Sequence, residues 1–187
     1  MLDKVIYETI KFFRNKETVK FVNEIMEIDN SNLVIENVYL GNIIDSQNLT
    51  FLTNNNIGAI VNCTENEPFH PYFDDLNSTN NKYKIRLEIN DSKDAENLNK
   101  FLNIIDTGVE FINTQKNINK QNIFVHCYWG LMRSATVVAG YLMKYEKYSI
   151  DAAIALIKNK RPYTFSNLYN FRDILVRYQT EFISLDK

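Results

Sequence analysis

The stretch VHCYWGLMRSAT (residues 125–136) joins an apolar run to a cysteine, a glycine and an arginine at short spacing. The β-type residues that lead into it, from Asn122, are typical of a buried strand that ends at Cys127. The small and apolar residues from Arg133 onward are typical of a helix. We therefore predict that Cys127 begins a tight loop between a strand and a helix.

A loop of this kind is suited to binding an anion and activating a thiol. Its backbone N–H groups and the helix N-terminus point at a common centre, and Gly130 lets the backbone curl where a Cβ would obstruct it. Arg133, six positions after Cys127, offers a planar fork that fits two phosphate oxygens. The same positive environment lowers the pKa of a cysteine, as nucleophilic attack near neutral pH requires. The alternative is a structural buried cysteine with an arginine nearby by chance.

Further β-type runs occupy residues 33–41, 58–64 and 83–89, and helical patterns over residues 46–55 and 95–114 lie between them. Strands that alternate with helices indicate an α/β fold. We predict a central, mostly parallel sheet of four to five strands flanked by helices. Ligands bind at the carboxyl ends of the strands in such sheets, and Cys127 stands at that edge.

Helical patterns also occupy both ends of the chain. Apolar residues recur at helical spacing over residues 2–26, with an interruption at RNKE (residues 14–17). After the cysteine stretch, we expect helices over residues 133–145, 150–160 and 167–182. Ser149 is the expected N-cap of the second of these helices, and Pro162 terminates it.

Composition excludes several classes of protein. The chain has 187 residues, 45% of them hydrophobic, which suits one domain with a substantial core. A net charge of −2 gives no electrostatic argument for nucleic acid, and no apolar run of about 18 residues predicts a membrane span. The only cysteines are Cys63 and Cys127, and the only histidines are His70 and His126, without zinc spacing. We expect an intracellular, cytoplasmic protein without a metal.

The segment HCYWGLMRS (residues 126–134) matches the His-Cys-x-x-Gly-x-x-Arg-Ser signature of the cysteine-dependent protein phosphatases, and its surroundings resemble the dual-specificity branch. From Asn32 onward, ENVYLGNIIDSQN resembles that family's opening strand pair, GAIVNCTENEP its next strand and loop, EIND its general-acid segment, and RSATVVAGYLM the helix after the signature. The resemblance implies a cysteine phosphatase-like fold, an N-terminal helical extension (residues 1–30), a catalytic domain (residues 31–187) and no cofactor.

The resemblance also implies roles by position. Cys127 would attack phosphorus and form a phosphocysteine intermediate. The side chain of Arg133 and the loop amides would bind the phosphoryl oxygens; the loop residues are Tyr128, Trp129, Gly130, Leu131 and Met132. Ser134 would hydrogen-bond the sulfur as it leaves. His126 would orient the loop and favour the thiolate without touching substrate.

The general acid is expected at Asp91, 36 positions before Cys127. It would protonate the leaving oxygen and then deprotonate the water that breaks the intermediate. Asp94 is an alternative if the loop is shifted. A third interpretation makes Asp91 a helix-start residue, because NDSKDAEN is a good N-terminal capping context.

Two loop positions depart from the family. Trp129 stands where alanine is common, and Met132 where a small polar residue braces the loop. These residues indicate tolerated packing variation, an aromatic wall of Tyr128 and Trp129 that selects substrate, or an impaired enzyme that binds phosphoproteins.

The loop interior carries no charged residue between Cys127 and Arg133. Related phosphatases that act on RNA 5′ phosphates or phosphoinositides tend to carry basic residues there. We therefore expect phosphorylated proteins as partners, with hydrolysis of phosphotyrosine and of phosphoserine or phosphothreonine. A catalytically weak phosphoprotein-binding module and a phosphatase of RNA 5′ phosphates or phosphoinositides are the alternatives.

Three features outside the signature complete the predictions. Arg161 is expected to lie either behind the site or at the surface, as a helix-end cation favoured by the helix dipole rather than as a substrate contact. Cys63 is interpreted as a small core residue, with a protective disulfide to Cys127 as the alternative. The N-terminal helices are expected to pack on the domain or to exchange between protomers of a homodimer.

Overall fold

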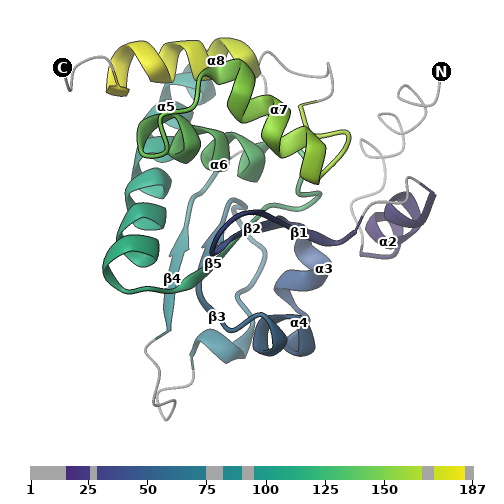
Figure 1. Cartoon of the computed structure of the whole chain (residues 1–187). Coiled ribbons are helices and arrows are strands. Elements are labelled where there is room, and N and C mark those ends of the chain that lie inside the picture. Colours follow the sequence, from purple (N-terminus) through teal and green to yellow (C-terminus); the bar gives the residue numbers. More distant parts are fainter. Residues whose placement is uncertain (1–15, 26–28, 75–81, 90–94, 166–170, 184–187) are drawn as a thin grey trace.

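The computed structural model describes residues 16–25, 29–74, 82–89, 95–165 and 171–183. Its strands form one five-stranded sheet in the order β1-β2-β5-β3-β4 (Figure 1). Their bounds are Ser31–Ile35 (β1), Val38–Gly41 (β2), Ile57–Asn62 (β3), Tyr83–Arg86 (β4) and Asn122–His126 (β5). β1 is antiparallel to β2, and the other neighbours are parallel. The predicted mostly parallel sheet is confirmed.

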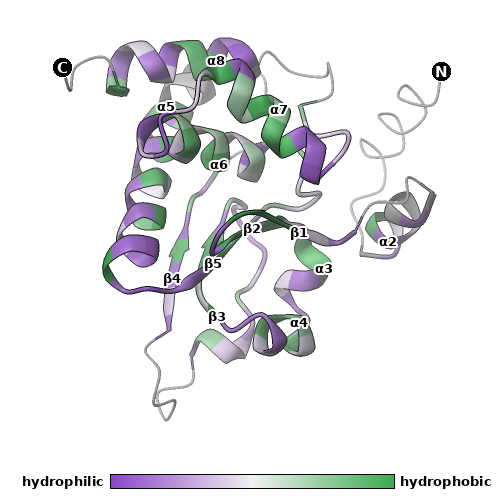
Figure 2. Cartoon of the chain, viewed as in Figure 1, coloured by the Kyte–Doolittle hydropathy of each residue, from purple (hydrophilic) through white to green (hydrophobic). Residues whose placement is uncertain are grey.

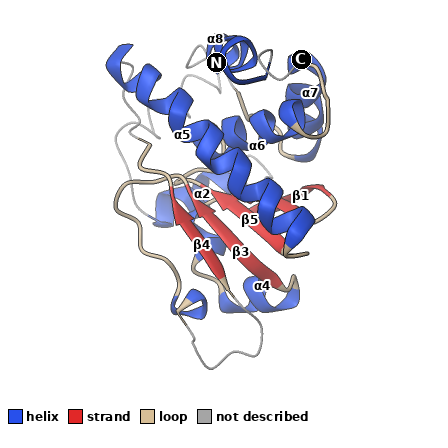
Figure 3. Cartoon of the chain, turned by 90° about the vertical axis from the view of Figure 1, so that its left-hand side faces the viewer, coloured by secondary structure: helices blue, strands red, loops and turns tan. Residues whose placement is uncertain are grey.

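Helices flank this sheet, and in Figure 3 α5 crosses the face of β3 and β5. The α-helices are α2 (Lys16–Ile25), α3 (Ile43–Ser46), α4 (Leu49–Asn54), α5 (Ala95–Asn113), α6 (Arg133–Lys144), α7 (Ile150–Lys160) and α8 (Phe171–Tyr178). A short 3-10 helix, η1 (Pro71–Phe73), precedes β4, and the π-helical turns η2 (Thr114–Ile118) and η3 (Gln179–Ile183) extend α5 and α8. Helix α2 lies in the predicted N-terminal extension.

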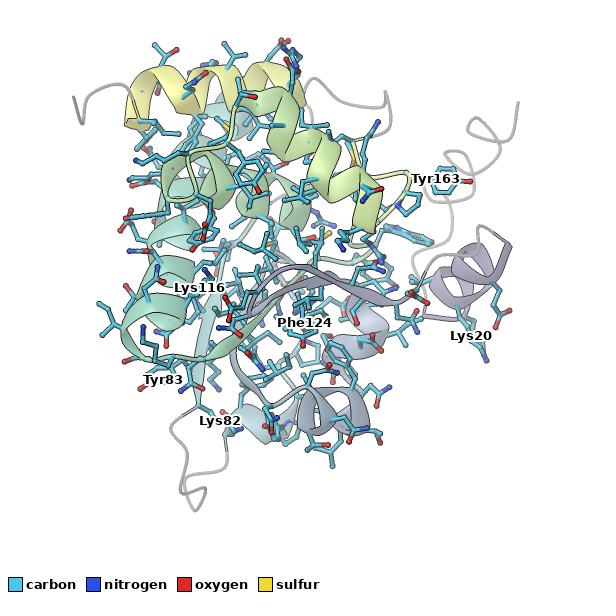
Figure 4. All side chains as sticks on the ribbon, viewed as in Figure 1. Lys20, Lys82, Tyr83, Lys116, Phe124 and Tyr163 are labelled. Atoms are coloured by element: carbon cyan, nitrogen blue, oxygen red, sulfur yellow. The ribbon has the colours of Figure 1, made fainter. Side chains whose placement is uncertain are left out.

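The strands send alternate side chains to two apolar layers, as a pleated strand requires. On β5, Ile123 and Val125 face the large cluster formed with α5, α6, α7 and α8. Phe124 faces the opposite layer with Leu52 of α4 and Phe73 of η1. Figure 4 places Phe124 in the middle of the molecule, and Figure 2 shows hydrophobic residues on the central strands. Both faces of the sheet are therefore covered, which leaves its strand ends as the place for a site.

Two expected elements differ from the structure. The helix expected over residues 46–55 is the shorter α4, and α3 before it was not predicted. Asn42 and Asn48 each cap a separate helix: their Oδ1 atoms accept from Ile44 N at 2.9 Å and Phe51 N at 3.1 Å. The β-type run over residues 33–41 is a hairpin, with Asn37 in the left-handed region at φ 65°.

The other helices agree with the prediction more closely. Helix α7 spans the expected residues, and the Oγ of Ser149 accepts from Ala152 N at 3.2 Å. Residues 2–15 of the expected N-terminal helix and residues 167–170 of the last helix lie outside the described residues. None of the helices in the described ranges is long and apolar enough to cross a membrane.

Candidate active site

The site begins where the central strand ends. β5 lies between β2 and β3, and its residues from Ile123 to His126 are buried. The chain then leaves the sheet at Cys127 and enters α6 at Arg133. We call the six residues between them, 127–132, the cysteine loop. This is the strand–loop–helix arrangement that the sequence predicts.

N–H and O–H donors outside the cysteine loop bind its carbonyl groups. Two of these carbonyls lie near the ends of the loop. The carbonyl of Tyr128 accepts a hydrogen bond from the N–H of Ile43, at the start of α3, at 3.2 Å. The carbonyl of Met132 accepts from the N–H of Thr136 at 2.8 Å and from its Oγ1 at 3.0 Å, within α6. These carbonyls are thus directed toward α3 and α6.

The three carbonyls in the middle of the cysteine loop are held by the chain that follows α7. Arg161 donates from Nη2 to the carbonyl of Trp129 at 3.1 Å and from Nε to that of Gly130 at 2.8 Å. The N–H of Phe165 donates to the carbonyl of Leu131 at 3.2 Å. A trans peptide plane points its C=O and the next N–H in opposite directions. The N–H groups of residues 129–132 therefore point away from these outside donors.

Gly130 brings one of these N–H groups to the thiol. Its N–H donates to the Sγ of Cys127 at 3.2 Å. The residue has φ 69°, and a Cβ there would lie 2.4 Å from the carbonyl oxygen of Gly41. Any other residue would be strained and would collide with β2, so the curl of the loop depends on glycine.

The thiol of Cys127 is 2% exposed and lies among groups that favour its ionised form. Burial alone would raise its pKa. The guanidinium of Arg133 opposes burial, and so do hydrogen bonds from Gly130 N and from Ser134 Oγ, the latter at 3.2 Å. The pKa of Cys127 is consequently below its ordinary value. Such a thiol is a nucleophile near neutral pH.

Arg133 connects the cysteine loop to the chain after β4. Its side chain is 7% exposed and donates from Nη1 to the carbonyl of Ile89 at 3.2 Å. Ile89 is itself buried. The two candidates for the general acid, Asp91 and Asp94, follow two and five positions later and lie outside the described residues.

His126 is buried in the sheet beneath the cysteine loop. Its ring stacks on Phe124 at a centroid distance of 5.5 Å, and its Nδ1 lies 3.3 Å from the carbonyl oxygen of Cys127. Burial lowers its pKa to about 3, and the cations Arg86 and Arg133 act in the same direction. The imidazole is therefore neutral at physiological pH and adds no positive charge to the thiolate.

The residues from β2 to η3 also match a known family by sequence. The sequence profile of the dual specificity phosphatase catalytic domain matches residues 38–181. The chain belongs to the dual specificity phosphatase family. The predicted family is confirmed, whereas the boundary predicted between residues 30 and 31 stays a prediction.

Individual relatives agree with this dual specificity phosphatase domain. Human dual specificity protein phosphatase 16 is 32% identical over 146 residues, which are 78% of this chain and 20% of that protein. Zebrafish dual specificity protein phosphatase 22-A is 31% identical over 153 residues, 82% of this chain and 67% of its own length. The chain thus spans about a fifth of the first of these relatives. The crystal structure of human DUSP28 has the same fold, with a TM-score of 0.64, 18% identity and coverage of 85% of this chain and 97% of that one.

The aromatic side chains of the cysteine loop lie in a small apolar cluster. Tyr128 is 9% exposed and Trp129 is 6% exposed, and both form a small apolar cluster with Val19 of α2 and Ile43 of α3. Tyr163 borders this cluster, on the side of the molecule where α2 lies (Figure 4). This packing supports tolerated variation over an aromatic wall, because little of either ring is exposed to a substrate.

Met132 and Leu131 complete the loop positions predicted for the phosphatase. Met132 occupies the N-cap position of α6 without a side-chain cap, so apolar contact replaces the small polar residue that was expected to brace the loop. Leu131 is 6% exposed. Any contact of these residues with phosphate would be made by their backbone N–H groups.

Arg161 is a residue whose place the sequence left open. It stands at the C-cap of α7, as a helix-end cation would, but its side chain is fully buried. The surface position is therefore wrong, and the alternative position behind the site agrees with the structure, because the guanidinium turns inward to carbonyl groups of the cysteine loop. The only sequence signal was its place before Pro162 in the segment NKRPYTFSN.

Cys63 lies in the same core cluster as Cys127, and both are free thiols. Cys63 is fully buried, and burial raises its pKa well above the ordinary value; the nearby Cys127 acts in the same direction, against Arg133. The thiol is therefore protonated and agrees with the interpretation as a core residue. Within the described ranges, no three His, Cys, Asp or Glu side chains are arranged to hold a metal ion.

Proposed function

We propose that this domain is an active protein phosphatase that hydrolyses phosphotyrosine and phosphoserine or phosphothreonine through a phosphocysteine intermediate. The observation that carries the proposal is the cysteine loop, whose carbonyls turn to outside donors around a thiol with a lowered pKa. With the carbonyls turned outward, the N–H groups of the same peptide planes point toward the thiol. N–H groups in that position stabilise an oxyanion that develops next to a thiolate.

In the first step, the Sγ of Cys127 attacks phosphorus and the P–O ester bond breaks. Arg133 and the loop N–H groups bind the three non-bridging oxygens and the charge that grows on them. Asp91 donates a proton to the leaving oxygen, which departs as an alcohol or phenol. The hydrogen bond from Arg133 to Ile89, two residues before Asp91, supports this assignment; Asp94 remains the alternative.

In the second step, water attacks phosphorus and the P–S bond breaks. Asp91 accepts the proton of the water, and inorganic phosphate leaves. Ser134 Oγ already donates to the sulfur at 3.2 Å, so it stabilises the thiolate that departs. His126, being neutral and buried, acts through its contact with the carbonyl of Cys127 and not through charge.

The experiment is hydrolysis of a small aryl phosphate by the wild type and by Cys127→Ser, with EDTA present. We expect turnover in the wild type and none in the variant. A matched variant, Cys63→Ser, should keep turnover because its thiol is buried and protonated. Binding of phosphopeptide without turnover in any of the three would instead make the domain a phosphoprotein-binding module.

Substrate class is tested separately with phosphotyrosine, phosphoserine and phosphothreonine peptides beside an RNA with a 5′ phosphate and a phosphoinositide. The uncharged loop side chains from Tyr128 to Met132 support peptides. A higher kcat/KM for either polyanionic substrate would contradict that part of the proposal.

A further inference from the structure

The guanidinium of Arg161 is a buried cation that forms no ion pair with a carboxylate among the described residues. The side chain is fully buried at the end of α7. Within the described residues, no carboxylate forms an ion pair with it; its acceptors are the carbonyls of Trp129, Gly130 and Asp29 and the Oδ1 of Asn32, the last at 3.0 Å. Burial of a charge is costly unless its hydrogen bonds are satisfied. Here they are satisfied by backbone carbonyls and one side-chain amide, two of them in the cysteine loop.

The geometry of these bonds points to the cysteine loop. Nε and Nη2 lie on one edge of the planar guanidinium, and they bind two consecutive carbonyls, those of Gly130 and Trp129. The N–H groups of Gly130 and Leu131 belong to the same two peptide planes and must point the other way. One of them, Gly130 N, reaches the Sγ of Cys127.

We propose that Arg161 is a positioning residue of the phosphatase reaction, which orients two loop amides toward the phosphoryl group and places a fixed positive charge behind the thiolate. The proposal rests on the proposed function for its reaction, but its test reads anion binding and thiol ionisation, which do not require turnover.

Two further observations support this role. Burial lowers the pKa of Arg161 to about 10, with Cys127, Asp45 and Asp29 acting against burial, so the group keeps its charge at physiological pH. The remaining nitrogen, Nη1, donates to the carbonyl of Asp29 and to the Oδ1 of Asn32, which lie before and within β1. Arg161 therefore fixes the cysteine loop to the start of the sheet.

Two substitutions separate the positive charge of Arg161 from its contact with the two loop carbonyls. Arg161→Met removes the charge and the contact. Arg161→Lys keeps a charge, but its single ammonium cannot reproduce the edge-on contact with two carbonyls. The matched control is Lys160→Met, one position earlier on α7, where the side chain is exposed. Circular dichroism and thermal unfolding establish that each variant is folded.

The assay is the rate at which iodoacetamide alkylates Cys127, followed by mass spectrometry against pH and against inorganic phosphate. The midpoint of the pH profile gives the pKa of Cys127, and protection by phosphate gives its Kd. For Arg161→Met we expect a raised pKa and at least tenfold weaker phosphate binding. For Arg161→Lys we expect a pKa near that of the wild type and several-fold weaker phosphate binding. Lys160→Met should match the wild type in both.

Each outcome supports or overturns the positioning role of Arg161. A folded Arg161→Met with the wild-type pKa and phosphate Kd overturns the proposal. If Arg161→Met does not fold, Arg161→Lys decides it, since wild-type phosphate binding in that variant would show that the two-carbonyl contact is dispensable. If neither folds, the role of Arg161 is structural and the proposal fails. If the wild type binds phosphate but hydrolyses nothing, the proposed function fails and the positioning of the loop by Arg161 is still measured.

Discussion

Replacing Ser134 with alanine should raise the pKa of Cys127 without unfolding the domain. The hydroxyl of Ser134 is fully buried and donates to Sγ at 3.2 Å. A hydrogen bond to a charged group contributes about 1.5–3 kcal/mol. Since one pKa unit corresponds to about 1.4 kcal/mol, loss of this bond should raise the pKa by about 1–2 units. The thiolate fraction near neutral pH falls accordingly.

The assay is the pH dependence of iodoacetamide alkylation at Cys127. Cys63 does not compete, because it is fully buried and its pKa is raised well above the ordinary value. The matched control is Ser46→Ala, which also removes a fully buried hydroxyl, here one that donates to the carbonyl of Ile43 at 2.8 Å. Ser46→Ala should lower stability slightly and leave the alkylation midpoint unchanged. An unchanged midpoint in Ser134→Ala would refute the assignment of this hydroxyl to the thiolate.

Three other perturbations have expected outcomes. Gly130→Ala adds a Cβ 2.4 Å from the carbonyl oxygen of Gly41 at a φ of 69°, so phosphate should cease to protect Cys127 from alkylation; retained protection would contradict the strain argument. His126 has a folded pKa of about 3 against an ordinary 6.5, so the unfolded state binds more protons between these values. Stability should fall by up to about 1.4 kcal/mol per pH unit as pH drops from 6.5 toward 3; urea unfolding of His126→Gln should lack this part of the slope. Trp129→Ala removes a ring that packs on α2 and should cost about 3–5 kcal/mol in the free energy of unfolding; a loss below about 1 kcal/mol would show that the cluster contributes little.

Local signals determined what could be predicted about the fold. The bounds of α7 follow from the Ser149 cap and the arginine–proline pair after it, both of which act within a few residues. The start of α4 also has a local signal, the cap residue Asn48, whereas α3 was missed because its four residues are too few to show a helical period. The spacing of Cys127 and Arg133 was sufficient to place the site at the end of β5.

What the sequence could not provide was the set of contacts that shape the site. The carbonyls of the cysteine loop are bound by Ile43 and by Arg161, which are separated from them in the chain by about 85 and 31 residues. No periodicity or spacing encodes which donor meets which carbonyl. The same holds for His126, whose neutrality results from complete burial and not from its neighbours in sequence.

The outside donors of the cysteine loop have a consequence for the time at which the thiol becomes reactive. A chain is synthesised from its N-terminus, so residues 127–132 are made before Arg161 and Phe165, the donors that hold three of the loop carbonyls. Until that last segment is in place, the carbonyls of residues 129–131 lack their donors, so the N–H of Gly130 is not held toward Sγ. We expect the pKa of Cys127 to stay near the ordinary value of about 8.5 in the incomplete chain. The growing chain would thus carry a mostly protonated thiol, and reactivity would arrive only when the fold is complete.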